Sequence, residues 1–170
     1  MARSATQKMV KIWRSRGVST KLKVRLLSSM VFPIASYGSE AWAMTAQDKK
    51  RVDSFELWCY RRVLRISWRD RRTNKWVLDK IGSGMVLRKG IAERKMRLFG
   101  HIMRREGLEK QLAQGKVPNP RRRGRPITTW YKDIQEMTGF GMAVASHLSK
   151  DKEGWRKLTR FHNLPSTITS

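Results

Sequence analysis

The amino-acid sequence predicts an all-α protein, and the spacing of its apolar residues is the main reason. Along most of the chain these residues recur every three or four positions, whereas no stretch shows the alternation by two that marks a β-strand. The clearest series is Val52, Phe55, Cys59, Val63 and Ile66. With 39% hydrophobic residues and seven Trp in 170 residues, the chain can also build a packed core.

Turn and capping residues divide the first part of the chain into two expected helices. The first occupies residues 1–16 and is stopped by Gly17. Ser19 is a suitable N-cap for the second, which is mostly apolar. Pro33 is expected to kink this second helix or to mark its last turns.

A long helix and a short one are expected next. The segment Thr45-Ala-Gln-Asp48 has the arrangement of a capping box, with Asp in place of Glu, and opens a helix to about Ser67. Residues 69–72 form a charged turn. Thr73 then caps a short helix that Gly82 closes.

The helix expected from about Val86 to Arg105 is two-sided. On a helical wheel at ~100° per residue, one side is apolar and carries Ile91, Leu98, Phe99, Ile102 and Met103. The other side is cationic and carries Arg94, Arg97, His101 and Arg104, with Arg105 beside them. Such a helix is suited to bury one side and to present the other to an anionic partner.

Shorter helices are expected in the remainder of the chain. One spans residues 108–114, another follows a cap at Thr128 or Thr129, and a third lies near residues 143–148. Ser149 is expected to cap a last helix, whose apolar residues are Trp155, Leu158 and Phe161.

These elements predict two helical parts joined by an extended segment. We expect a helical bundle at residues 1–115 and a small helical module at residues 127–162. The basic linker between them, residues 116–126, contains three prolines that exclude continuous helix. Residues 163–170 are expected to form a flexible tail.

The charge of the chain indicates an anionic partner. The formal net charge is +25, from 38 Lys/Arg against 13 Asp/Glu, and self-repulsion on this scale disfavours a compact fold. RNA, DNA or an RNA–DNA hybrid would relieve that repulsion. A membrane is not expected, because no apolar run approaches the ~20 residues needed to span a bilayer.

The few cysteines and histidines limit the chemistry further. A single cysteine, Cys59, excludes an internal disulfide and a zinc site built from several cysteines. The three histidines are far apart in sequence and lack the spacing of metal ligands, so neither a metal nor a cofactor is expected. No signal peptide is visible, and the sequence fits a nuclear or cytoplasmic location.

The candidate contacts to nucleic acid are the cations of the helices and of the linker. Residues 88–126 hold 13 Lys/Arg against 3 Asp/Glu, a difference of +10. A solvated helix face would ordinarily mix the two signs, so this excess favours phosphate contact over simple solvation. The candidates are Arg61, Arg65, Arg94, Arg97, Arg104, Arg105, Lys116, Arg121, Arg122, Arg123 and Arg125.

Two further features leave alternatives open. Arg123-Gly124-Arg125-Pro126 has the core pattern of an AT-hook, in which arginines enter a narrow minor groove, but it is also compatible with a flexible basic linker. The Trp residues could stack on bases. Core packing is the better interpretation for four that lie at helical spacing with other apolar residues, namely Trp58, Trp76, Trp130 and Trp155. For Trp13 and Trp68, which lie among arginines, both interpretations stay open.

Signatures of catalysis are missing from the sequence. It contains no phosphate-binding loop, no glycine-rich dinucleotide turn, and no Asp-Asp pair that would hold two catalytic metals. No carboxylate partner can be assigned to His101, which is interpreted as a surface or packing residue. We therefore expect no enzymatic activity from this chain alone.

Several motifs, in order, resemble those of non-LTR (LINE-type, RTE-like) retrotransposon reverse transcriptases. Tyr37-Gly38-Ser39-Glu40-Ala41-Trp42 resembles the YGxExW motif, and residues 55–68 resemble the block FExWCxRRxLRISW downstream of the polymerase palm. Residues 98–104 resemble the FGHxxR segment. The closing region is matched by Gly124-Arg125-Pro126 with Trp130, and by Asp151 with Trp155-Arg156. The resemblance covers about residues 8 to 160.

The resemblance implies a thumb and C-terminal region without the palm, fingers and endonuclease. A thumb holds the template–primer duplex through its backbone, so the implied function is to grip template RNA or an RNA–DNA hybrid without polymerase activity. The alternative is a non-catalytic structural or protein-interaction remnant of a truncated retroelement. In that case Leu22, Leu26 and Met30 could belong to a surface that packs on a palm in a full-length parent. The oligomeric state is not predicted.

Overall fold

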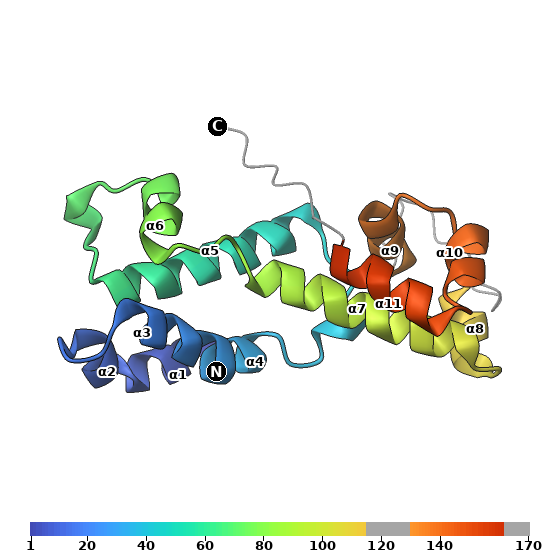
Figure 1. The fold of residues 1–170 in the computed structure, drawn as a ribbon, viewed down its shortest axis with the longest axis horizontal. Coiled ribbons are helices and arrows are strands. Elements are labelled where there is room, and N and C mark those ends of the chain that lie inside the picture. The colour runs from blue at the N-terminus through green and yellow to red at the C-terminus, as the bar shows by residue number, and fades with distance from the viewer. Residues whose placement is uncertain (115–129, 162–170) are drawn as a thin grey trace, which may run out of the picture. The chain divides into compact units, whose positions relative to one another are not determined.

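The computed structural model describes residues 1–114 and 130–161, and their regular secondary structure is entirely helical (Figure 1). The predicted all-α class is therefore confirmed. The linker predicted at residues 116–126, with its AT-hook pattern, and the tail predicted at residues 163–170 lie outside the described residues. None of the described helices is long and apolar enough to cross a bilayer.

The chain divides into two compact units, whose boundaries differ from the predicted ones. The first unit combines Met1–Tyr37 with Ala46–Lys89, and the second combines Gly38–Thr45 with Gly90–Ser170. The predicted bundle of residues 1–115 is thus split between them. The helices predicted as a separate module at residues 127–162 belong with the helix that precedes them, because they bury their apolar faces in a core shared with it.

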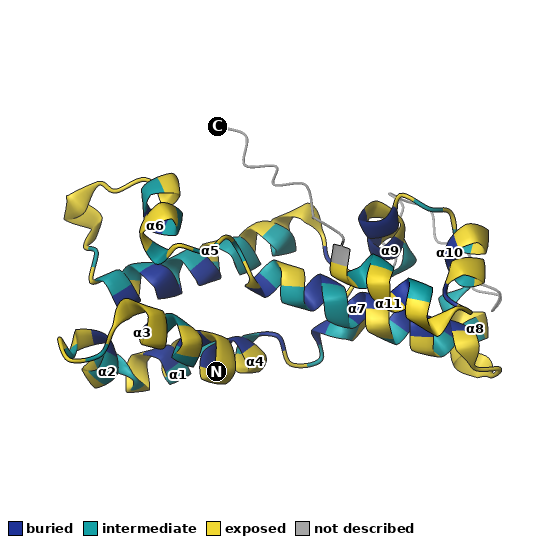
Figure 2. Cartoon of the chain, viewed as in Figure 1, coloured by how far each residue is buried: buried dark blue, intermediate teal, exposed yellow. Residues whose placement is uncertain are grey.

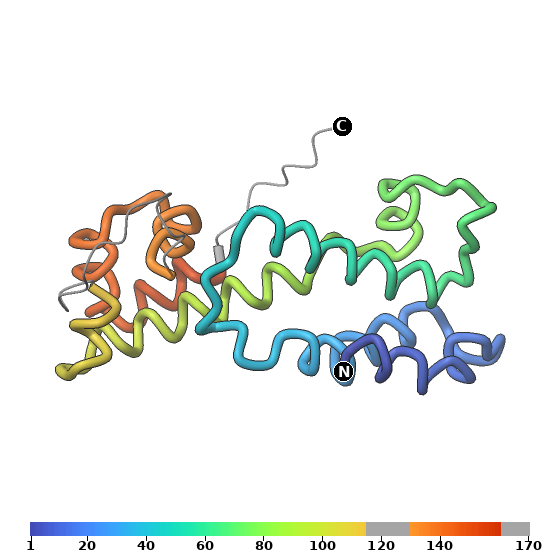
Figure 3. Tube along the Cα trace, turned by 180° about the vertical axis from the view of Figure 1, so that it is seen from behind, coloured from blue at the N-terminus to red at the C-terminus, as the bar shows by residue number. Residues whose placement is uncertain are grey.

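The first unit is built from short N-terminal helices that pack against one long helix (Figure 3). The elements are α1 (Ala2–Lys8), α2 (Val10–Arg14), α3 (Thr20–Leu26), the π-helical turn η1 (Leu27–Val31), α4 (Phe32–Ala35), α5 (Ala46–Leu64), the 3₁₀ turn η3 (Trp68–Asp70) and α6 (Asn74–Ile81). The buried apolar residues include Trp13, Leu27, Val31, Tyr60 and Val77. Figure 2 shows buried positions in dark blue along α5 and on the N-terminal helices. Several expected ends are confirmed: Ser19 and Thr73 cap α3 and α6, and Gly82 closes α6 with a φ of 71°.

The second predicted helix is interrupted in the way that its proline suggests. After α3 the backbone widens into η1 and then resumes as α4. Pro33 lies in the first turn of α4, where a residue without an N–H is tolerated because that donor has no partner inside the helix.

Two cations hold the C-terminal end of α2, where the backbone carbonyls lack helical partners. Lys23 Nζ donates to Trp13 O at 3.0 Å and to Ser15 O at 2.8 Å, and Lys23 is itself buried. The Arg65 guanidinium also donates to Trp13 O, at 3.2 Å, and to Arg14 O. Cations at a helix C-terminus satisfy these carbonyls and oppose the helix dipole. Burial lowers the pKa of Lys23, and the Arg65 charge adds to this effect.

At the N-terminus of α7, a buried carboxylate accepts hydrogen bonds from backbone N–H groups that lack partners inside the helix. Glu56 of α5 accepts hydrogen bonds from Val86 N at 2.7 Å, from Leu87 N at 3.0 Å and from the Tyr60 hydroxyl at 2.7 Å. These two amides open α7 (Leu87–Arg104), so Glu56 caps that helix from another element. Burial raises the pKa of Glu56, and the hydrogen bonds act against this rise.

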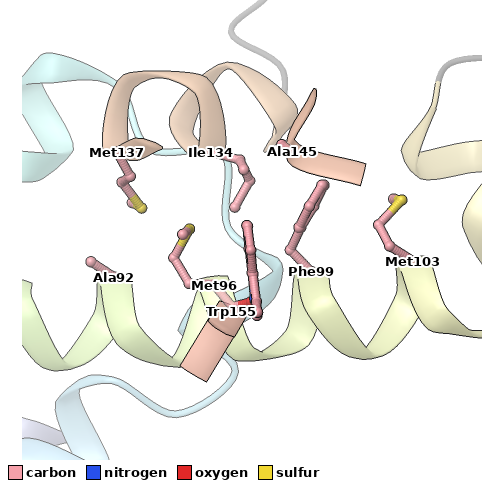
Figure 4. Close-up of a cluster of buried hydrophobic side chains, with 8 residues drawn as sticks. All are labelled: Ala92, Met96, Phe99, Met103, Ile134, Met137, Ala145 and Trp155. Carbon is pink, nitrogen blue, oxygen red and sulfur yellow. The ribbon is translucent and has the colours of Figure 1, made fainter. Parts of the chain in front are cut away.

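The second unit is organised around α7, whose first turn contains the boundary between the units. Its other elements are η2 (Ser39–Ala41), α8 (Leu108–Ala113), α9 (Trp130–Thr138), α10 (Met142–Leu148) and α11 (Lys152–Phe161). Figure 4 shows the core, in which side chains of α7 point toward α9 and α10 while Trp155 enters from α11. The buried members are Ala92, Met96, Phe99, Met103, Ile134, Met137, Ala145 and Trp155.

The predicted cap of the last helix is wrong by two residues. The Asp151 carboxylate accepts from Glu153 N at 3.0 Å, which is the contact of an N-cap side chain. Ser149 is buried, and its hydroxyl donates to Ser146 O at 2.8 Å. Ser149 therefore ends α10 instead of beginning α11.

A buried ion pair joins three segments of the second unit that are distant in sequence. Lys95 Nζ lies 2.6 Å from Asp133 Oδ2, and the two side chains are 0% and 1% exposed. Lys95 Nζ also donates to Trp42 O at 2.5 Å, while Asp133 Oδ2 accepts from Met44 N at 2.8 Å. Nearby, the Trp130 indole donates to Glu40 O at 2.6 Å. These contacts fix residues 38–45 against α7 and α9.

Removing one partner of this pair should destabilise the fold strongly. We expect Lys95→Met to lower the free energy of unfolding by about 3–5 kcal/mol, because it leaves the Asp133 charge buried without its counter-ion. The double variant Lys95→Met/Asp133→Asn should recover part of this loss, since the Asn oxygen can still accept from Met44 N. Urea denaturation measures both values. A loss below about 1 kcal/mol in the single variant would contradict a structural role for the pair.

Candidate nucleic-acid interface

The position of α11 depends on a close contact between Trp155 and Gly100. The Trp155 side chain is buried, its indole Nε1 donates to Met96 O at 2.8 Å, and its ring centroid lies 5.4 Å from that of Phe99 (Figure 4). A Cβ atom at Gly100 would lie 2.5 Å from two atoms of the indole ring. Only glycine therefore allows α11 to lie this close to α7.

This packing combines the cations of two helices on one surface. Five of them line a shallow pocket of about 220 Å³ and define what we call the α7–α11 basic surface, namely Arg97, Arg104, Lys152, Arg156 and Arg160. All five are exposed to solvent. The rest of the pocket is formed by Glu93, Trp155 and Thr159, so one carboxylate accompanies the five positive charges.

The charges of this surface are largely uncompensated. In the part of the chain that the structure describes, none of the five cations forms an ion pair with a carboxylate. One guanidinium has a structural contact, since Arg104 Nη1 donates to Ser149 O at 2.8 Å at the end of α10. The remaining donors face solvent and are available to an anion.

The arrangement is suited to bind phosphate groups. Arginine offers a planar set of N–H donors that matches two phosphate oxygens, and lysine adds a mobile point charge. Lys152, Arg156 and Arg160 follow one another at spacings of four residues and so share one face of α11. Cations repeated along two neighbouring helices suit a chain of phosphates better than a single small anion. Across residues 1–114 and 130–161, no three His, Cys, Asp or Glu side chains gather as a metal-binding group.

The structure brings only some of the predicted contact residues together. Arg97 and Arg104 belong to the α7–α11 basic surface, and Arg105 is exposed at the end of α7. Arg94 is half-buried, and its Nε donates to Gly90 O at 3.3 Å within the same helix. The other predicted residues either lie around a pocket of the first unit or fall outside the described residues; the former are Arg61 and Arg65, and the latter are Lys116, Arg121, Arg122, Arg123 and Arg125.

The cations of α11 were missed by the sequence interpretation. That interpretation named the apolar residues of this helix and used Arg156 only in a motif match, not as a contact to nucleic acid. The signal was nevertheless present, because Lys152, Arg156 and Arg160 repeat by four on the same helix that carries Trp155. What the sequence did not reveal was that α11 lies against α7, since this depends on a tertiary contact.

The environments of the Trp residues only partly follow the predictions. Trp155 is buried and Trp130 is half-buried against the core, as expected. Trp58 and Trp76 are half-buried, and each ring is accompanied by a guanidinium, at 5.1 Å for Arg62 and 4.8 Å for Arg72. Trp13 and Trp68, for which both interpretations were open, differ completely in exposure: Trp13 is 2% exposed and Trp68 is 83% exposed.

Comparisons with known proteins do not identify the chain. No protein-family model matches it, and no curated protein or solved structure does either.

The contact between Gly100 and Trp155 generates a stability prediction with a matched control in the same helix. Gly100→Ala should lower the free energy of unfolding by about 1–3 kcal/mol, because its new methyl group overlaps a buried ring. Gly90→Ala introduces the same methyl group where no atom lies within 4 Å, and should stabilise α7 by about 0.5–1 kcal/mol. Thermal and urea denaturation would compare the two variants. Equal effects would contradict the described placement of α11.

Proposed function

We propose that this protein binds nucleic acid through the sugar–phosphate backbone, with the α7–α11 basic surface as a principal contact. The observation that carries the proposal is the convergence of five cations from two helices, with one carboxylate among the lining residues and, within the described residues, no ion pair to neutralise them. Ordinary solvated helices mix charges of both signs.

The overall charge supports the same conclusion. A net charge of +25 on 170 residues produces self-repulsion in the folded chain, and a phosphate-rich partner would reduce it. Binding would release counterions from the nucleic acid, which makes the affinity depend steeply on salt. Backbone contacts carry no direct sequence information, so we expect little preference for particular bases at this surface.

The sequence motifs suggest a specific setting for this binding. We propose that the chain corresponds to the thumb and C-terminal region of a non-LTR retrotransposon reverse transcriptase and grips template RNA or an RNA–DNA hybrid, without polymerase activity of its own. The motif residues have structural roles that support this proposal. Gly100 of the FGHxxR-like segment receives Trp155, and the backbone of the YGxExW-like segment contacts Lys95 and Trp130.

A second candidate function is supported by an exposed apolar strip in the first unit. Of the residues predicted for this surface, Leu22 and Met30 are 47% and 53% exposed and Leu26 is half-buried. Ile34 of α4, which was not among them, is 46% exposed. Large apolar side chains exposed together are typical of surfaces that contact another protein. In this case the chain would serve as an interaction piece, for example against a polymerase palm in a full-length parent, and its main partner would bind independently of salt.

The salt dependence of binding tests the first proposal. We expect the triple variant Arg97→Gln/Lys152→Gln/Arg156→Gln to flatten the slope of log K against log salt by about 2–3 units, because each lost phosphate contact contributes about 0.7–0.9. Arg104 is left in place, since it also holds the end of α10. Fluorescence anisotropy with a labelled RNA duplex, DNA duplex and hybrid would measure the slope.

A charge-matched control separates a local contact from the loss of overall charge. Lys8→Gln/Lys21→Gln/Lys50→Gln removes three exposed cations that line neither of the two basic pockets. This variant should keep a slope closer to that of the unmodified chain. If both triple variants flatten the slope equally, or if neither does, the α7–α11 basic surface is not the contact.

A further inference from the structure

A second basic pocket lies wholly within the first unit and contains aromatic side chains. It has a volume of about 690 Å³, within the roughly 300–1,000 Å³ common for small-molecule sites. We call it the Trp68 pocket and define it by Arg14, Trp58, Arg61, Arg62, Arg65 and Trp68. No carboxylate is among its described lining residues, which include four arginines.

The most exposed aromatic residue of the pocket is held on a fixed turn. Trp68 begins η3, where the Asp70 carboxylate accepts from Ser67 N at 2.6 Å and the Ser67 hydroxyl accepts from Arg69 N at 3.4 Å. The turn is thus capped from both directions. An indole that is 83% exposed on such a turn adds little to the core. The Arg69 guanidinium lies over the ring at 5.7 Å from its centroid, and the large exposed fraction still leaves most of the indole surface open to a ligand.

The arginines of the pocket fall into two groups. Arg61 Nη2 donates to Arg72 O and to Asn74 Oδ1, both at 2.9 Å, and Arg65 donates to carbonyls of α2. These two cations are anchored by backbone carbonyls and, for Arg61, by the Asn74 side chain. Arg14 and Arg62 are exposed, and among the described residues they form no ion pair with a carboxylate. Arg62 also lies over the Trp58 ring, at 5.1 Å from its centroid.

We propose that the Trp68 pocket binds an unpaired nucleotide of a single-stranded segment. The base would stack on the Trp68 ring, and the adjoining phosphate would meet Arg14 and Arg62. Exposed aromatic rings beside cations are the usual elements of sites for single strands, because every base has a face that can stack. The proposal rests on the nucleic-acid binding proposed above and adds recognition of unpaired bases, which the α7–α11 basic surface does not provide.

The test compares two strands that differ only in their bases. The full chain is titrated with a short single-stranded RNA and with an abasic strand of the same length and phosphate number. Stacking predicts that the RNA binds about fivefold or more tightly than the abasic strand. Trp68→Ala should remove this preference while leaving the affinity for the abasic strand unchanged, and Trp68→Phe should retain part of it. Trp42→Ala, which removes an indole that is 41% exposed in the second unit, should keep the preference intact.

Three results would overturn the inference. The unmodified chain could bind both strands equally, Trp68→Ala could keep the preference, or Trp68→Ala could weaken binding of both strands by the same factor, as expected for a purely structural residue. The proposed backbone binding fails differently. If backbone binding at the α7–α11 basic surface is wrong, the salt slope of the triple variant will be unchanged. The preference for RNA over the abasic strand can still be measured in that case, so the two proposals can fail separately. No binding of either strand would overturn both proposals.

A direct measurement shows whether the ligand of the Trp68 pocket is a strand or a free nucleotide. The indole N–H resonance of Trp68, assigned with Trp68→Phe, is followed while a trinucleotide or a mononucleotide is added. A shift that saturates with the trinucleotide at lower concentration than with the mononucleotide supports a strand as the ligand. A resonance that stays in place at saturating trinucleotide, or that responds equally to both probes, contradicts the proposal.

Discussion

The second unit depends on the contact of Trp155 with the bare backbone of Gly100. This contact allows α11 to lie against α7, and it is reinforced by the hydrogen bond from the Trp155 indole to Met96 O. Two helices that are each cationic on their outer faces thereby present their charges on one surface. Close packing and charge repulsion act in opposite directions here, because the contact that stabilises the core also concentrates like charges. A bound polyanion would resolve this conflict, which is why the packing itself supports the proposed function.

Buried charged groups stabilise each of the two units internally. Lys95 with Asp133, Glu56 at the start of α7 and Lys23 at the end of α2 are all almost completely buried and contact backbone groups or one another. Such groups are costly to bury unless their hydrogen bonds are satisfied, so each contact is specific in geometry. Lys23 and Glu56 satisfy backbone groups at helix ends, and the Lys95–Asp133 pair fixes residues 38–45 against α7 and α9. Many exposed cations are left for a partner, because the chain has 38 Lys/Arg against only 13 Asp/Glu.

The fold class and most helices could be predicted from the sequence, because apolar spacing and caps such as Ser19 and Thr73 are local signals. The division into units could not, since it depends on which apolar faces meet in a common core. The cationic face of α7 was recognised through Arg97 and Arg104, whereas its continuation on α11 required a tertiary contact. The buried Lys23 and Lys95 were also missed, because a lysine in a helix is ordinarily solvated.

The central claim is that nucleic acid lies on the α7–α11 basic surface, and arginine-specific footprinting tests it most directly. The rates at which phenylglyoxal modifies individual arginines would be measured by mass spectrometry, with and without saturating RNA–DNA hybrid. Modification of Arg97, Arg156 and Arg160 should slow several-fold, while exposed arginines that line neither basic pocket, such as Arg25, should react at the same rate. Unchanged rates at Arg97, Arg156 and Arg160 in a fully bound sample would contradict the account.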